Sequence, residues 1–207
     1  MSQALTTRRI HGVRNLTIVA LVVWFLFALG GSLLGVFNSE PRPPLPLGLA
    51  AVVPVAVFVA SYLTSARFRE FVSSLDLRML TLTQTFRVIG IVFVILYFLG
   101  ALPGVFALPA GWGDFAVGIT APVVAWYWKR PFPYRTFVVW NVLGILDLVT
   151  AMSLGVLASA TPVGALAGDV TTRLMGQFPL SLVPTFFVPL LLILHLICFA
   201  RVGKGVA

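Results

Sequence analysis

Long apolar stretches separated by short polar segments run through this sequence. A helix needs about 20 mainly apolar residues to cross the hydrocarbon core of a bilayer, and six stretches approach that length. They cover about Leu16 to Phe37, Pro46 to Leu63, Leu80 to Leu102, Ala110 to Trp128, Thr136 to Ser159 and Leu180 to Ala200. The pattern predicts an all-α polytopic membrane protein: a single domain over residues 1–207, built as a bundle of six transmembrane helices.

A different periodicity lies between the second and third apolar stretches. Phe68, Phe71, Val72 and Leu75 recur at i, i+3, i+4 and i+7, and charged or hydroxyl side chains occupy the other positions. This spacing is typical of an amphipathic helix with one apolar face. We therefore expect a short interfacial helix over about residues 66–77, lying on the cytoplasmic surface of the membrane.

Composition supports a membrane protein, because 59% of the residues are hydrophobic and only 10% are charged. A soluble domain with so few polar residues could not cover its own surface. The net charge of +8 does not indicate nucleic-acid binding, since the basic residues fall between the apolar stretches and form no single basic face.

The distribution of basic residues predicts the orientation of the chain. With six spans, both termini lie on one side, and most Lys and Arg residues fall on that side. They are Arg8, Arg9, Arg14, Arg67, Arg69, Arg78, Lys129, Arg130, Arg135, Arg201 and Lys204. Arg42 and Arg173 fall on the opposite side. Cytoplasmic loops of membrane proteins carry the excess of basic residues, so we expect the N- and C-termini to be cytoplasmic.

Five polar residues within the apolar stretches form the predicted functional site: Gln84, Arg87, Asn141, Asp147 and His195. At 1.5 Å rise per residue, Arg87 lies about 10 Å from the inner end of its span, Asn141 and His195 about 8 Å, and Asp147 about 17 Å. Charges at such depth persist where they face the protein interior or line a wet path. Because a guanidinium cannot lose its proton, Arg87 needs a partner, and we expect it to pair with Asp147.

Gly111 to Asp114 read GWGD, which resembles the GxGD signature of intramembrane aspartyl proteases, in which two aspartates share a proton. By the predicted spans, Asp114 lies at the outer start of the fourth helix and Asp147 much deeper. Carboxylates at different depths cannot share a proton. We therefore expect Asp114 to cap that helix and expect no enzymatic activity.

The sequence predicts no cofactor and no metal site. A haem held by two histidines would need a second one in the membrane, and His11 precedes the first span. His195 and Cys198 are one turn apart, but two ligands do not make a metal site. A single cysteine excludes an internal disulfide.

At larger scale, a set of residues spread over the last two thirds of the chain resembles an uncharacterised family of small polytopic bacterial membrane proteins. The set is Gln84, Arg87, Gly100, Leu102, Pro103, Gly111 to Asp114, Trp140, Asn141, Gly144, Pro184, Pro189 and His195. The resemblance implies a bacterial inner-membrane location and no defined activity.

Two functions are compatible with the sequence. In the first, the protein is a small permease-like carrier or channel whose five polar residues bind a polar or anionic solute. In the second, it is a non-catalytic scaffold or accessory subunit whose buried charges only hold the bundle together. The expected partners are the lipid bilayer and a small solute, and the sequence leaves open a homo-oligomer or a protein partner.

Overall fold

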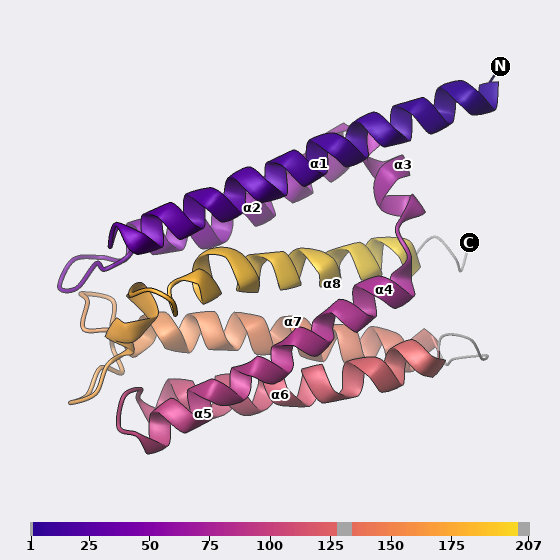
Figure 1. The fold of residues 1–207 in the computed structure, drawn as a ribbon. Helices are drawn as coiled ribbons and strands as arrows, with labels where there is room; N and C mark the ends of the chain where they lie inside the picture. The colour runs from indigo at the N-terminus through magenta and orange to yellow at the C-terminus, as the bar shows by residue number, and fades with distance from the viewer. Residues whose placement is uncertain (1, 128–133, 203–207) are drawn as a thin grey trace.

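The computed structural model describes residues 2–127 and 134–202, with side chains from residue 12 onward. All regular structure in this part is helical, and Figure 1 shows the long helices running along a common direction. The elements are α1 (Ser2–Leu33), α2 (Leu45–Thr64), α3 (Ala66–Ser74), α4 (Leu77–Thr83), η1 (Gln84–Gly90), α5 (Ile91–Phe98), α6 (Gly104–Tyr127), α7 (Tyr134–Leu157), η2 (Thr172–Gly176), η3 (Val183–Phe187) and α8 (Val188–Val202).

Helix α6 is the centre of the packing. It contacts α7 on one side and the continuous rod formed by α4, η1 and α5 on the other, while α8 packs against both α7 and α2. Its buried residues include alanines and glycines, such as Ala107, Gly111, Gly118 and Ala121. Small residues let helix backbones approach closely, which is how helices in lipid gain packing energy.

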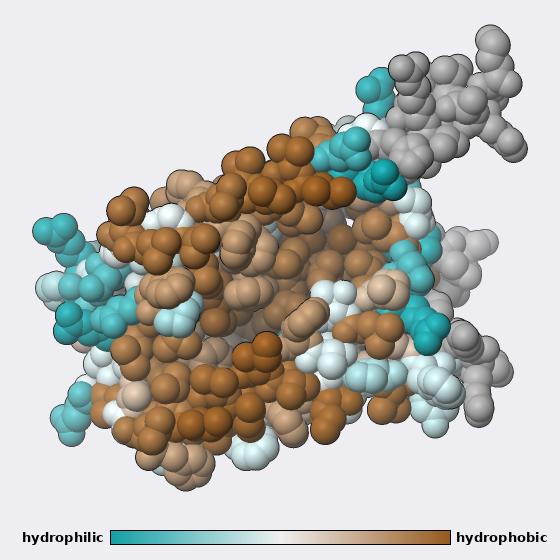
Figure 2. Space-filling model, in the orientation of Figure 1, coloured by the Kyte–Doolittle hydropathy of each residue, from teal (hydrophilic) through white to brown (hydrophobic). Residues whose placement is uncertain are grey.

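The surface of the molecule is mostly apolar. Five helical segments are long and apolar enough to cross a membrane: Gly12–Leu33, Leu45–Thr64, Leu77–Phe98, Tyr134–Leu157 and Val183–Val202. Figure 2 shows an apolar belt across the middle of this face, with hydrophilic residues at two opposite ends. The all-α fold and this belt are compatible with a membrane protein. Helix α6 is not among the five, although its 24 residues are sufficient in length.

The fourth predicted helix begins earlier than expected. The predicted start was Ala110, because the stretch around Gly100 to Gly111 is rich in glycine and proline, which is typical of a loop. In the structure α6 begins at Gly104, directly after Pro103, and includes Pro109 in its second turn. A proline inside a packed helix is tolerated where neighbouring groups satisfy the freed carbonyl. The earlier start changes the depth of every residue that follows.

The predicted interfacial helix is present as α3, but its apolar face does not point toward lipid. The Ser65 side chain accepts a hydrogen bond from Phe68 N at 3.2 Å and so caps the helix. Phe71 and Val72 are buried in a cluster with Ile197 of α8. Helix α3 therefore packs onto the bundle through its apolar face, and its position at the membrane surface stays a prediction.

Helix α8 starts with a π-helical turn, η3, that proline chemistry explains. Pro189 has no N–H to donate to the carbonyl of Thr185 one turn earlier. That carbonyl accepts a hydrogen bond from Trp24 Nε1 at 3.1 Å, and the Trp24 ring packs against Phe186. The first long helix is thus attached to the start of the last one.

Some predicted features lie outside the described residues. They are the positions of Trp128, Lys129, Arg130 and Lys204 and the side chains of Arg8, Arg9 and His11.

Candidate functional site

A 3₁₀ segment in the middle of the third predicted span presents the site's cation. Element η1 carries Gln84, Arg87 and Gly90, and all three are buried. A 3₁₀ helix has three residues per turn, so residues at i, i+3 and i+6 lie in one row along it. The row faces α6, α7 and α8, and places Arg87 in the interior of the bundle.

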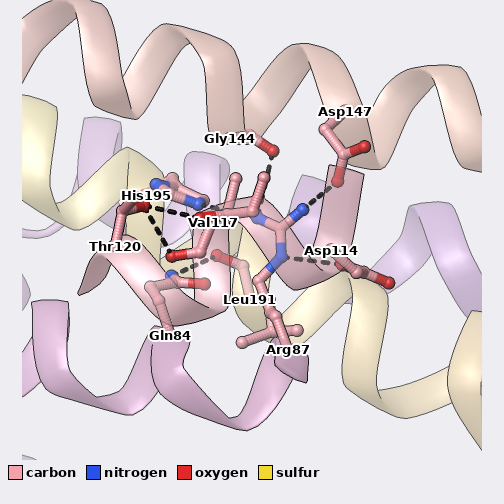
Figure 3. Close-up of polar contacts among 10 residues, drawn as sticks. Gln84, Arg87, Asp114, Val117, Thr120, Gly144, Asp147, Leu191 and His195 are labelled. Atoms are coloured by element: carbon pink, nitrogen blue, oxygen red, sulfur yellow. Dashed lines mark hydrogen bonds and ion pairs between the residues drawn. The ribbon is translucent and has the colours of Figure 1, made fainter. Parts of the chain in front are cut away.

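The buried guanidinium of Arg87 donates hydrogen bonds to three other helices (Figure 3). Its Nε donates to Asp114 Oδ1 of α6 at 2.7 Å, and its Nη2 forms an ion pair with Asp147 Oδ2 of α7. Its Nη1 contacts the Gly144 carbonyl oxygen and His195 Nε2, both at 3.2 Å. The predicted pair of Arg87 with Asp147 is therefore present, and a second carboxylate shares the same cation.

The hydrogen bonds of His195 determine its protonation. Arg87 can only donate, so His195 Nε2 must accept and the ring is neutral. The proton then lies on Nδ1, which is 2.9 Å from Asn141 Oδ1. Asn141 Oδ1 is free to accept, because Asn141 Nδ2 donates to the Phe137 carbonyl oxygen at 2.9 Å. Trp140 packs against the imidazole with ring centroids 5.5 Å apart. This chain of donors and acceptors orients the imidazole toward Arg87.

Glycines make the space that the polar groups occupy. Three of them each lie against one polar side chain: Gly90 against Asp114, Gly113 against Asp147, and Gly144 against His195. A Cβ on Gly144 would lie 2.5 Å from His195 Nε2, far inside van der Waals contact. The glycines on η1, α6 and α7 are therefore part of the site, and two of them, Gly113 and Gly144, belong to the set of residues that carries the family resemblance.

Asp114 is the functional-site residue that the sequence analysis assigned wrongly. It does not cap the outer end of a helix, because α6 begins at Gly104 and Asp114 lies ten residues further, at the level of Arg87. Asp114 and Asp147 both bind Arg87, so the expected difference in their depth is wrong and does not exclude the GxGD resemblance. A different feature separates this site from an aspartate dyad: each carboxylate binds its own guanidinium nitrogen, with the cation between them.

Gln84 lies one turn before Arg87 on η1, and the structure shows no hydrogen bond between the two side chains. Its Nε2 donates to the Leu191 carbonyl oxygen of α8 at 3.3 Å, while its Oε1 is buried without a partner. Four of the five predicted site residues thus form one connected network with Asp114, and Gln84 lines its edge. We call Arg87, Asp114, Asp147, Asn141 and His195 the ionic cluster.

The ionic cluster has an excess of negative charge. With both carboxylates ionised and His195 neutral, its formal charge is −1. The Arg87 side chain is completely buried, whereas the Asp114 and Asp147 side chains keep 12% and 15% of their surface exposed. A solute therefore cannot reach the guanidinium of Arg87 in this arrangement, and the two carboxylates are the charged groups of the cluster that keep exposed surface.

A cavity of about 70 Å³ lies toward the end of the bundle that holds the loop between α1 and α2. Its wall on α7 includes Ala151 and Gly155, one and two turns from Asp147 on the same helix face. Glu40 closes its rim, because its Oε1 accepts hydrogen bonds from Ala160 N at 2.9 Å and Thr171 Oγ1 at 3.3 Å. The cavity and Asp147 thus share one face of α7.

Comparison with known proteins gives a family and no activity. No curated protein and no solved structure matches the chain. A family model described as a domain of unknown function, DUF8737, matches residues 44–202, which include every residue of the ionic cluster. The chain therefore belongs to the DUF8737 family.

Proposed function

We propose that this protein is a multi-pass protein of the bacterial cytoplasmic membrane with six spans. Helix α6 would be the sixth crossing segment, since its 24 residues extend about 36 Å and a hydrocarbon core is about 30 Å thick. Its single charge, Asp114, forms an ion pair with Arg87 inside the bundle. The excess of basic residues in alternate loops supports cytoplasmic N- and C-termini.

Within this membrane setting we propose a non-enzymatic function, as a small carrier for a polar solute. The observation that supports it is the ionic cluster, which holds three full charges at mid-span. Intramembrane charges mark solute or ion pathways in many membrane proteins. A mid-helix 3₁₀ segment such as η1 often marks a hinge, and it provides the element that could move Arg87 between two arrangements.

The geometry favours a neutral or cationic solute over an anionic one. All three guanidinium nitrogens of Arg87 already donate to protein acceptors. The completely buried guanidinium leaves an anion at most one N–H, on Nη2, and two carboxylates lie beside it. A polar solute that donates hydrogen bonds would instead meet the exposed parts of Asp114 and Asp147.

One observation favours the scaffold as the second candidate. The fully buried Arg87 side chain binds residues of α6, α7 and α8 at once, and buried charges with satisfied hydrogen bonds can specify how helices pack. A scaffold would need the cluster for folding and would bind no solute.

A thermal-shift screen distinguishes the two candidates. Purified protein would be melted with amino acids, amines, polyols and sugars at two pH values. A solute that binds the folded state at 100 times its Kd stabilises it by about 2.7 kcal/mol. We expect one solute class to raise the Tm of the wild type and of the control Asp76→Asn, which keeps the cap of α4. Asp147→Asn should lose this response.

The scaffold would be supported by the opposite result. No solute in the panel would then change the Tm of the wild type, or a solute would stabilise Asp147→Asn as much as the wild type.

A further inference from the structure

We propose that Asp114 and Asp147 together carry one exchangeable proton, which is bound to one of the two carboxylates at a time. The proton follows from the ionic cluster alone. Its use in transport, as proton coupling of the carrier, rests on the proposed function.

The charges that face the two carboxylates do not balance them. Element η1 contributes the Arg87 cation, and α8 contributes His195, which is neutral because its Nε2 accepts from Arg87. Within the residues whose side chains the structure describes, the ion pairs are those of Arg87 with Asp114 and Asp147. One cation thus faces two anions, and a net charge of −1 in a bilayer interior is costly.

Other titratable groups on the packed elements lie away from the carboxylates. Arg78 on α4 and Tyr97 on α5 are about ten residues from Arg87 in either direction along the same span. Arg201 is near the end of α8 and bonds the Ser73 carbonyl oxygen, and Arg173 lines the cavity rim. Cys198 is buried in an apolar cluster. Tyr127 at the end of α6 and Tyr134 and Arg135 at the start of α7 are more than ten residues along the chain from the aspartate of their own helix. None of these groups forms an ion pair with the cluster.

The geometry of the two carboxylates leaves an oxygen of each available to a proton. Each one uses a single oxygen for Arg87, which is Oδ1 in Asp114 and Oδ2 in Asp147. The other oxygens lie against glycines, Asp114 Oδ2 beside Gly90 and Asp147 Oδ1 beside Gly113. Both side chains keep part of their surface exposed. A proton needs only one such oxygen, so it neutralises the cluster without any rearrangement of Arg87.

The proposed step is the transfer of one proton from the solvent to the ionic cluster. A hydronium ion of the solvent gives up one O–H bond and leaves water, and its proton forms an O–H bond with a carboxylate oxygen that does not bind Arg87. The charge of the cluster rises from −1 to 0, and the ion pair of Arg87 with the other aspartate remains. Because the two carboxylates are coupled through one cation, the proton belongs to the pair and not to either residue.

Infrared spectroscopy of the protein in phosphatidylcholine vesicles tests this directly, because a carboxylic acid has a C=O stretch that an ionised carboxylate lacks. We expect the wild type to show this band at neutral pH and to shift it in D₂O. Both Asp114→Asn and Asp147→Asn should lose the band, since Arg87 then balances the remaining carboxylate. The controls Asp76→Asn and Glu40→Gln, both outside the cluster, should keep it.

A second measurement covers the case in which the asparagine variants do not fold. The chain contains four aspartates, so ¹³C-labelled aspartate in the wild type allows their carboxyl signals to be separated by solid-state NMR. We expect one signal with the chemical shift of a protonated carboxyl, and we assign it to the cluster. It should therefore persist in Asp76→Asn, since its loss there would identify Asp76 as its source.

Three results would overturn the proposal: no protonated carboxyl at neutral pH, a band that both asparagine variants retain, or a band that does not shift in D₂O. A band seen in choline buffer and absent in sodium or potassium buffer would also overturn it, in favour of an alkali cation.

None of these readings uses a solute. A failed solute screen therefore removes the carrier and leaves the proton, while loss of the band leaves a carrier without proton coupling.

Discussion

Arg87 suits its position because a guanidinium has separate nitrogens that point in different directions. Nε binds α6, Nη2 binds α7, and Nη1 contacts both α7 and His195 of α8. A lysine ammonium is a point charge without this planar fork, so it could not hold both carboxylates in the same geometry. Residue chemistry thus explains why one side chain can join three helices.

The glycine at position 144 gives a prediction at this scale. Gly144→Ala places a methyl group where the His195 ring lies, at 2.5 Å from its Nε2. We expect a loss of stability of about 1–3 kcal/mol, as for other overpacked interiors, measured by thermal unfolding in detergent.

The matched control is Gly48→Ala in α2, where an added Cβ meets nothing within 4 Å. It should be neutral or stabilising by up to about 1 kcal/mol, because alanine is the better helix former. Equal stability of the two variants would show that Gly144 does not face His195.

Asp114 shows where residue-level inference from sequence failed. The charge itself was visible, but its depth depended on where its helix starts, and the loop predicted for the Gly/Pro-rich stretch around Gly100 to Gly111 placed that start six residues too late. The partner of Arg87 on α7 was predictable because Asp147 was the only other charge at comparable predicted depth. Gly113 and Gly144 belong to the set that carries the family resemblance, but their contacts with Asp147 and His195 could be recognised only in the structure.

At the scale of elements, the apolar runs contained enough information to locate the helices. Each of the six predicted segments contains a helix, since length and hydrophobicity are local properties of the chain. The 3₁₀ geometry of η1 and the π turn of η3 were not predictable in this way. Both depend on tertiary contacts, such as the hydrogen bond from Trp24 to the Thr185 carbonyl.

Helix α3 illustrates the same limit. Its periodicity predicted one apolar face but could not tell whether that face meets lipid or protein. The structure packs Phe71 and Val72 against α8, and Arg69 Nη1 donates to the Leu63 carbonyl oxygen at 2.8 Å near the end of α2. Contacts between segments far apart in sequence decided the outcome.

At the scale of the whole molecule, the proposed orientation predicts which loops are accessible from each side. Ser74 is the exposed last residue of α3 on the proposed cytoplasmic side, and Gly168 lies in the exposed segment after α7 on the opposite side. Single cysteines at these positions, in a Cys198→Ala background, would be treated with a membrane-impermeant maleimide in intact cells. We expect Gly168→Cys to be labelled and Ser74→Cys to be labelled only after the cells are opened.

Labelling of Ser74→Cys in intact cells would reverse the orientation. Labelling of both positions from the same side would mean that the number of crossings between them is even, and would contradict the six-span topology.

The central claim is that one buried cation holds two carboxylates, and a pair of double-mutant cycles tests it most directly. Arg87→Leu would be combined with Asp114→Asn and, separately, with Asp147→Asn, and the free energy of unfolding measured for each variant. Groups in contact show coupling energies of about 0.5–3 kcal/mol, and we expect coupling of this size for both aspartates. Additive effects of Arg87→Leu and Asp114→Asn would contradict the claim, because Asp114 would then lie outside the ionic cluster.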